Sequence, residues 1–108
     1  MSIVNVNISL LSMLNTDLEV GDKFPLEVEA FRQKILQSEC FLFASPEYNY
    51  TVTAPLKNAI NWASRPPNVF ADKAVAIVSS GGGFGGWLAQ YSLRQNGVFL
   101  DLTLVRIL

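Results

Sequence analysis

Apolar and polar side chains alternate near the start of the chain, whereas further on the apolar side chains recur at the spacing of a helix. Residues 4–10 alternate, which predicts a strand with one polar face near the edge of a sheet. Pro25 suits the first turn of a helix, and the apolar positions after it recur every three or four residues. We therefore expect a helix over residues 25–37.

Two later runs, residues 40–44 and 74–78, are apolar throughout. A short apolar run without alternation is typical of a strand that helices cover on both faces, as in the interior of a parallel sheet. Between the two runs we expect a helix that begins near Pro55. It should end at residues 65–67, because consecutive prolines remove backbone donors and clash with the preceding turn.

The last third of the chain repeats this order. Residues 79–86 form a glycine-rich turn, and a helix is expected over residues 87–96, closed by Gly97. Leucines on one face of residues 98–105 then predict a final strand that is less fully covered.

The sum is a β-α-β-α-β-α-β order within 108 residues. This order predicts an α/β fold with one domain over residues 1–108, in which right-handed crossovers connect a parallel sheet with helices on both faces. Ligands of such a sheet bind at the carboxyl ends of its strands.

Composition removes several classes of function. A net charge of −1 with 16% charged residues gives no field that attracts nucleic acid or an anionic membrane surface. The chain contains no histidine, which removes Ser-His and Cys-His nucleophile pairs and imidazole metal ligands. No stretch approaches the ~20 apolar residues of a membrane span, and we expect no membrane partner.

The single cysteine, Cys40, lies inside an apolar run. It forbids an internal disulfide, and its setting predicts a packed thiol rather than a nucleophile. Together with the absence of a recognisable secretion signal, this favours a reducing, cytoplasmic location.

The strand expected at residues 40–44 is followed by a loop that combines backbone donors with aromatic rings. A planar, electron-poor ligand such as a flavin could use the amides of residues 47–49 and the two tyrosine rings. A plain surface loop, with its tyrosines packed on neighbouring helices and Glu47 solvated, is the open alternative. The candidate residues of this loop are Pro46, Glu47, Tyr48, Asn49 and Tyr50.

The glycine-rich turn is the second candidate site. Its glycines would let a ring system approach the backbone. The turn also contains G-x-G-x-x-G, with Asp101 further on, which leaves a Rossmann-type NAD site as an alternative. Asp101 lies midway along the last expected strand rather than at its end, which weighs against that alternative. The candidate residues here are Ser79, Ser80, Gly81, Gly82 and Gly83.

With these residues in view, the chain resembles the flavodoxin-like NADPH-dependent FMN reductases, and most closely their plant-type NAD(P)H:quinone oxidoreductases. The matching stretches are residues 13–19, 46–50, 54–60, 62–69 and 81–86. The resemblance implies FMN, with its ring held by residues 46–50 and 79–83, hydride transfer from NAD(P)H, and two-electron reduction of a quinone. It also implies a homo-oligomer.

Family members begin with a strand, a phosphate-binding loop and a helix, and the resemblance starts after all three. The expected fold is therefore a partial flavodoxin-like domain, truncated at both ends, with weakened FMN binding. The helix over residues 25–37 could let residues 4–9 pair directly with residues 40–44 and close the gap. An inactive isoform that assembles with full-length subunits through Trp87 and its neighbours is the alternative role.

Overall fold

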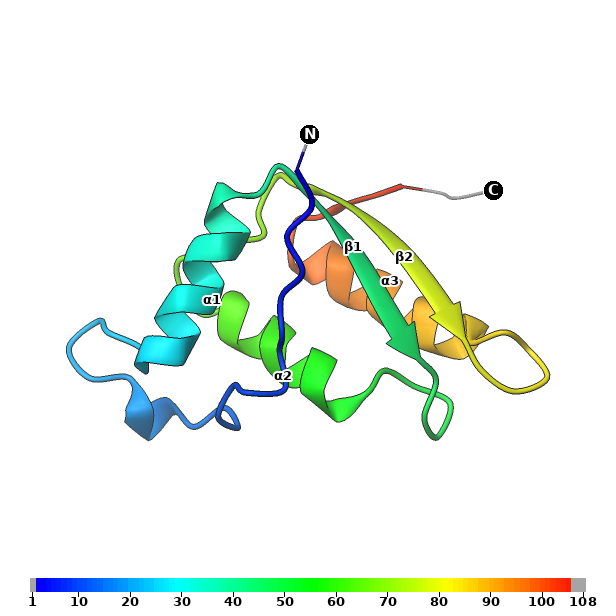
Figure 1. Ribbon diagram of the computed structural model, residues 1–108, viewed down its shortest axis with the longest axis horizontal. Helices are drawn as coiled ribbons and strands as arrows, with labels where there is room; N and C mark the ends of the chain where they lie inside the picture. The colour runs from blue at the N-terminus through cyan, green and yellow to red at the C-terminus, as the bar shows by residue number, and fades with distance from the viewer. Residues whose placement is uncertain (1, 106–108) are drawn as a thin grey trace.

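A computed structural model describes residues 2–105 of the chain. These residues form three α-helices, one short 3-10 helix (η1) and a parallel three-stranded sheet in the strand order β1-β2-β3. Figure 1 shows the three α-helices with β1 and β2. The elements are η1 (Thr16–Leu18), α1 (Leu26–Gln37), β1 (Cys40–Pro46), α2 (Ala54–Ala63), β2 (Ala74–Ser80), α3 (Trp87–Phe99) and β3 (Thr103–Leu104).

The α/β class and the parallel sheet are as predicted. β1 and β2 pair over their full length, from Cys40 opposite Ala74 to Pro46 opposite Ser80. α1 begins directly after Pro25, and α2 ends before residues 65–67. Pro25 thus marks the beginning of α1, and Pro66 and Pro67 mark the end of α2, because proline is excluded from a helix interior.

The last helix is longer and the last strand shorter than expected. α3 continues through Gly97 to Phe99, which leaves β3 with two residues. A Cβ at Gly97 would lie 3.1 Å from Cδ2 of Leu104. The glycine therefore serves as a close-packing position between α3 and β3 and not as a helix C-cap.

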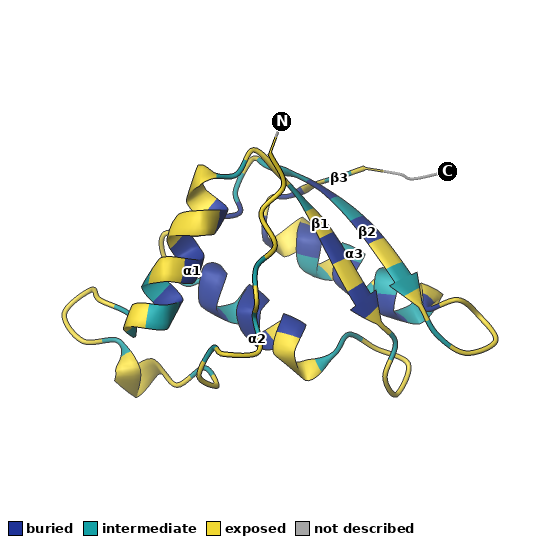
Figure 2. Ribbon diagram, viewed as in Figure 1, coloured by how far each residue is buried: buried dark blue, intermediate teal, exposed yellow. Residues whose placement is uncertain are grey.

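β1 is covered on one face only, which corrects the expectation of a strand buried on both. Burial alternates along it (Figure 2): Phe43 and Ser45 are buried, whereas Leu42 is 61% exposed. Cys40 is exposed too, so the prediction of a packed thiol is wrong. An apolar run identifies residues that tolerate burial, but whether a second layer covers them depends on tertiary structure.

Residues 4–10 form no strand, which corrects the predicted edge strand and its pairing with β1. Val6 and Ile8 still pack against the core, half-buried, on the side predicted by the alternation. Alternation specifies which side chains face inward, but a strand also needs a neighbour for its backbone hydrogen bonds.

The core lies between the covered face of the sheet and the helices. Trp62 of α2 is fully buried, meets Phe24 edge to face at 6.1 Å between ring centroids, and donates its indole N–H to the carbonyl of Ser12. Asn58, one turn earlier, bonds the carbonyl of Ser12 and the N–H of Leu14. α2 thus fixes the segment that precedes η1.

Two cationic side chains satisfy the carbonyls at helix C-termini. Arg32 of α1 is 5% exposed and donates to the carbonyls of Trp62 and Ala63 at the end of α2 and of Pro67 beyond it. Burial lowers the pKa of its guanidinium. Lys73 donates to the carbonyls of Ile35, Leu36 and Ser38 at the end of α1. Both place positive charge at the negative end of a helix dipole.

Among residues 2–105, no helix has the length and apolar character needed to cross a bilayer.

Candidate functional site

The two predicted loops start side by side. Pro46 at the end of β1 is the register partner of Ser80 at the end of β2, and both loops leave the same edge of the sheet (Figure 1). We call residues 46–50 the tyrosine loop and residues 79–86 the glycine loop. The expectation that both gather at neighbouring strand ends is confirmed.

The tyrosine loop is a tight turn with strained backbone. The N–H of Tyr48 bonds the carbonyl of Thr51 at 3.1 Å, and the reverse bond measures 3.0 Å. Asn49 and Tyr50 between them have φ of 51° and 63°, which is common for asparagine but costly for tyrosine. Because the N–H of Tyr48 is bonded within the turn, it is not free for a ligand. The expectation that residues 47–49 offer three consecutive backbone donors is therefore wrong for Tyr48.

The rings of the tyrosine loop face outward. Tyr48 is 64% exposed and Tyr50 70% exposed, so the alternative in which they pack on neighbouring helices is wrong. A residue held in a strained backbone conformation with its ring in solvent is more typical of a binding surface than of a packing position.

Glu47 is not merely solvated. Its Oε2 accepts hydrogen bonds from the backbone N–H groups of Leu88 and Ala89, at 3.0 and 3.1 Å, in the first turn of α3. Thr51 adds a second link, since its Oγ1 donates to the Oγ of Ser92. Neither link is predicted by the sequence. They join residues some forty positions apart, and no local pattern signals them.

The glycine loop leaves its backbone open at the two central positions. A Cβ at Gly82 or Gly83 would meet no atom within 4 Å, whereas one at Gly81 would lie 3.1 Å from the Cβ of Glu47. Gly81 therefore allows the two loops to touch, and Gly82 and Gly83 leave an accessible main-chain surface. Ser80 is exposed next to them.

Ser79 and Gly86 close the base of the glycine loop. The Oγ of Ser79 donates toward the carbonyls of Gly85 and Gly86 and accepts from Nε2 of Gln90. Gly86 has φ of 78°, and a Cβ there would lie 2.7 Å from the Oγ of Ser79. Glycine is required at this position on both grounds.

We expect Gly86→Ala to destabilise the protein by about 1–3 kcal/mol, from a left-handed alanine plus displacement of Ser79. Gly83→Ala is the matched control, because Gly83 has no positive φ and open space around it; its effect should stay within about 0.5 kcal/mol. Urea denaturation followed by circular dichroism measures both. Equal effects of the two substitutions would contradict this account.

The Rossmann alternative does not fit this geometry. A pyrophosphate would need free N–H groups at the start of α3, but those of Leu88 and Ala89 already bond Glu47. The carbonyl of Asp101 accepts from the N–H of Asp72, just before β2, whereas the glycine loop follows β2. Asp101 and the glycines therefore lie at opposite ends of the strand.

An open groove of about 470 Å³ runs beside the tyrosine loop toward the N-terminus of α2. Its volume lies within the range of small-molecule sites. The lining residues are Tyr48, Asn49, Thr51, Val52, Thr53, Ala54 and Lys57.

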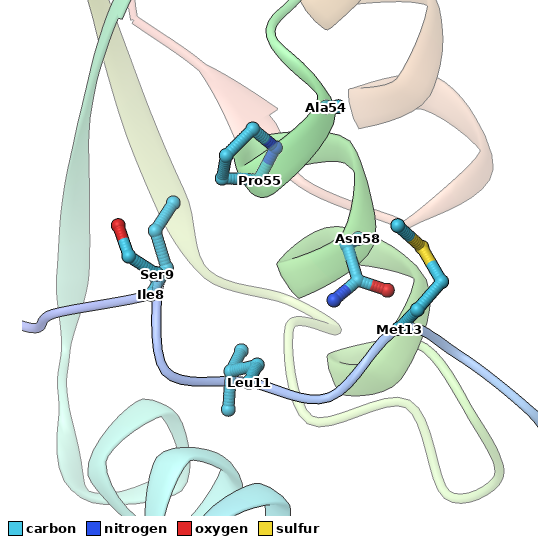
Figure 3. A pocket seen from close by; sticks show the side chains of 7 residues that line it. All are labelled: Ile8, Ser9, Leu11, Met13, Ala54, Pro55 and Asn58. Carbon is cyan, nitrogen blue, oxygen red and sulfur yellow. The ribbon is translucent and has the colours of Figure 1, made fainter.

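A smaller hollow of about 180 Å³ also lies at the start of α2 and shares Ala54 with the groove (Figure 3). Ile8, Leu11 and Met13 face Pro55 and Asn58 across it. Asn58 bonds Ser12 and Leu14, so this hollow is the seam between α2 and the preceding segment, and the Asn58 side chain serves to hold that seam together.

The two loops suit the ring of a flavin better than its phosphate. Exposed tyrosine rings and bare glycine backbone offer flat contact and main-chain hydrogen bonds. Neither loop contains lysine or arginine. Lys57, in the neighbouring groove, donates its ammonium to Oδ1 of Asn61. Within residues 2–105, no cluster of three or more His, Cys, Asp or Glu could hold a metal ion.

Compared with known protein families, residues 1–107 match the NADPH-dependent FMN reductase family in sequence. The chain belongs to this family. An NAD(P)H:quinone oxidoreductase of Solanum tuberosum is 70% identical over 102 residues, which cover 94% of this chain and 53% of that protein. An NADPH:quinone oxidoreductase of Arabidopsis thaliana is 67% identical over 97 residues, covering 90% and 50%.

The fold of this FMN reductase family member also agrees with that of a solved relative. FerB of Paracoccus denitrificans, a flavoenzyme NAD(P)H:(acceptor) oxidoreductase, superposes with a TM-score of 0.84 at 30% identity, covering 93% of this chain and 56% of that one. The flavodoxin-like class predicted from the sequence is thereby confirmed. The chain spans about half the length of the curated relatives that it matches.

Proposed function

We propose that this chain binds the ring of FMN at the tyrosine and glycine loops and takes part in two-electron transfer from NAD(P)H to a quinone. The observation that carries the proposal is the pairing of Pro46 with Ser80, which sets the two loops side by side. Family membership and the similarity to plant quinone oxidoreductases support the same chemistry.

The chain's own groups would bind and orient the ring. Tyr48 and Tyr50 offer exposed ring faces, and the open backbone at Gly82 and Gly83 allows close approach of a flat ligand. FMN supplies the hydride and electron chemistry when bound. No side-chain acid or base is then required, which is compatible with a chain that contains no histidine.

The proposal predicts that this chain distinguishes little between FMN and riboflavin. The two loops contain no cation, and each charge-assisted hydrogen bond to a phosphate contributes about 1.5–3 kcal/mol. With no such bond from the loops, we expect the two dissociation constants to agree within about threefold. Quenching of flavin fluorescence in parallel titrations measures both, and FMN binding a hundredfold tighter than riboflavin would contradict a ring-only site.

A direct test combines binding with turnover. The purified chain is titrated with FMN, and NADPH oxidation is then followed with a quinone as acceptor. Tyr48→Ala should weaken flavin binding about tenfold through lost stacking, and Tyr91→Ala is the matched control, since Tyr91 is an exposed tyrosine of α3. If neither flavin binds to the unaltered chain, the proposed function is rejected.

A second candidate role, assembly with full-length family subunits, is favoured by the uncovered apolar surface. Leu42 on β1 is 61% exposed, Phe84 70%, Trp87 55% and Phe99 83%, and a subunit contact would bury apolar side chains that are now in solvent. Separately from this role, we propose that the chain is cytoplasmic and forms a homo-oligomer. Sedimentation of the chain with and without a full-length relative tests this role, and a monomer in both experiments excludes it.

A further inference from the structure

The carboxylate of Glu47 replaces a local N-cap for α3. Ser, Thr, Asp and Asn are the preferred N-cap residues of helices, because their side chains bond the first backbone N–H groups. Here the N-cap residue is Gly86, which has no side chain to offer. The Oε2 of Glu47, from a loop forty residues earlier, accepts from Leu88 and Ala89 instead.

The same residue contacts the glycine loop. The Cβ of Glu47 is the atom that a Cβ on Gly81 would approach to 3.1 Å, so the stem of Glu47 lies against the main chain at Gly81. Its carboxylate bonds the helix that follows the glycine loop. One half-buried side chain thus joins the tyrosine loop to Gly81 and to the helix that follows the glycine loop.

We propose that Glu47 is a positioning residue that fixes the spacing between the tyrosine and glycine loops, and through it the affinity for a flavin ring. This inference rests on the proposed function of the two loops. The negative charge lies at the positive end of α3, and two charge-assisted bonds hold it there. The carboxylate is therefore engaged in structure and does not act as a catalytic acid or base.

Side-chain reach separates this role from a general effect of charge. Glu47→Asp keeps the charge but is one methylene too short to bond Leu88 and Ala89 from the present backbone position. Glu47→Gln loses the charge but keeps an acceptor oxygen at the same reach. Glu39→Asp is the matched control, because Glu39 is exposed at the opposite end of β1.

Two flavin-free measurements on the 108-residue chain report the spacing. We expect amide exchange at Leu88 and Ala89 to accelerate about tenfold in Glu47→Asp, as for the loss of a helix N-cap. In the same Glu47→Asp variant, the nuclear Overhauser contact between the β-protons of residue 47 and the α-protons of Gly81 should disappear. Glu47→Gln should retain the contact and exchange within about threefold of the unaltered chain, and Glu39→Asp should change neither.

Riboflavin titration of the same variants completes the test. We expect affinity to fall about tenfold in Glu47→Asp and to remain within about threefold in Glu47→Gln. Unchanged exchange and an unchanged contact in Glu47→Asp would overturn the inference, as would unchanged riboflavin affinity despite loosened loops. Failure of the unaltered chain to bind riboflavin would reject the proposed flavin site and the inference about affinity. The amide exchange of Leu88 and Ala89 would then still decide whether Glu47 joins the loops.

Discussion

Trp62→Ala is expected to destabilise the protein by about 3–5 kcal/mol, a large part of the ~5–15 kcal/mol that stabilises a typical domain. The indole is fully buried, contacts the ring of Phe24 edge to face, and donates its N–H to the carbonyl of Ser12 at 2.7 Å. Truncation to alanine leaves a cavity and also removes the donor on which the segment before η1 depends.

Two further variants separate the loss of buried apolar volume from the loss of the indole N–H donor. Trp62→Phe keeps most of the apolar volume and loses the N–H, so we expect a loss of about 1–2 kcal/mol. Trp87→Ala is the control, because Trp87 is 55% exposed and should lose no more than about 1 kcal/mol. Midpoints of urea denaturation measure all three. Equal losses at Trp62 and Trp87 would show that burial of Trp62 does not stabilise the fold.

Arg32→Met is expected to lower the free energy of unfolding by about 2–4 kcal/mol. Arg32 is 5% exposed, and the substitution keeps an apolar stem but removes every donor of the guanidinium. Each buried carbonyl left without a partner costs about 1–3 kcal/mol. The oxygens of Arg65 and Pro67 would lose the bonds that Arg32 makes at 3.0 and 2.8 Å. Those of Trp62 and Ala63, which Arg32 bonds at 2.8 and 3.2 Å, would keep the backbone N–H groups of Arg65 and Val69 as donors.

Lys34→Met on the same helix is the matched control. Lys34 is exposed, so its substitution should change stability by no more than about 0.5 kcal/mol. Arg32→Lys should recover only part of the loss, because one ammonium cannot reproduce the fork that the guanidinium presents to several carbonyls. Full recovery by lysine would contradict a role for that geometry.

Prolines and helical spacing made the helices predictable. α1 begins after Pro25 and α2 ends before the Pro66-Pro67 pair, because proline acts on its own neighbourhood whatever surrounds it. Gly97 was misread, since its packing against Leu104 is a contact between two elements. Residues 4–10 were misread for the same reason, since alternation cannot supply a pairing partner.

At the candidate site, the loops were predictable and their internal bonds were not. The positions of residues 46–50 and 79–83 follow from the order of strands and helices, since carboxyl ends of parallel strands meet at one edge. That Tyr48 uses its N–H within the turn, and that Glu47 binds α3, depends on how the chain folds back on itself.

The class of fold, the helix boundaries at proline and the two loops after β1 and β2 follow from the amino-acid order, because they depend on local conformation and on the succession of elements. Tertiary packing was needed to leave one face of β1 open, to bring Arg32 and Lys73 to helix C-termini, and to join the loops through Glu47. Such contacts link residues far apart in the chain, and a backbone group takes whichever partner the fold brings within hydrogen-bonding distance.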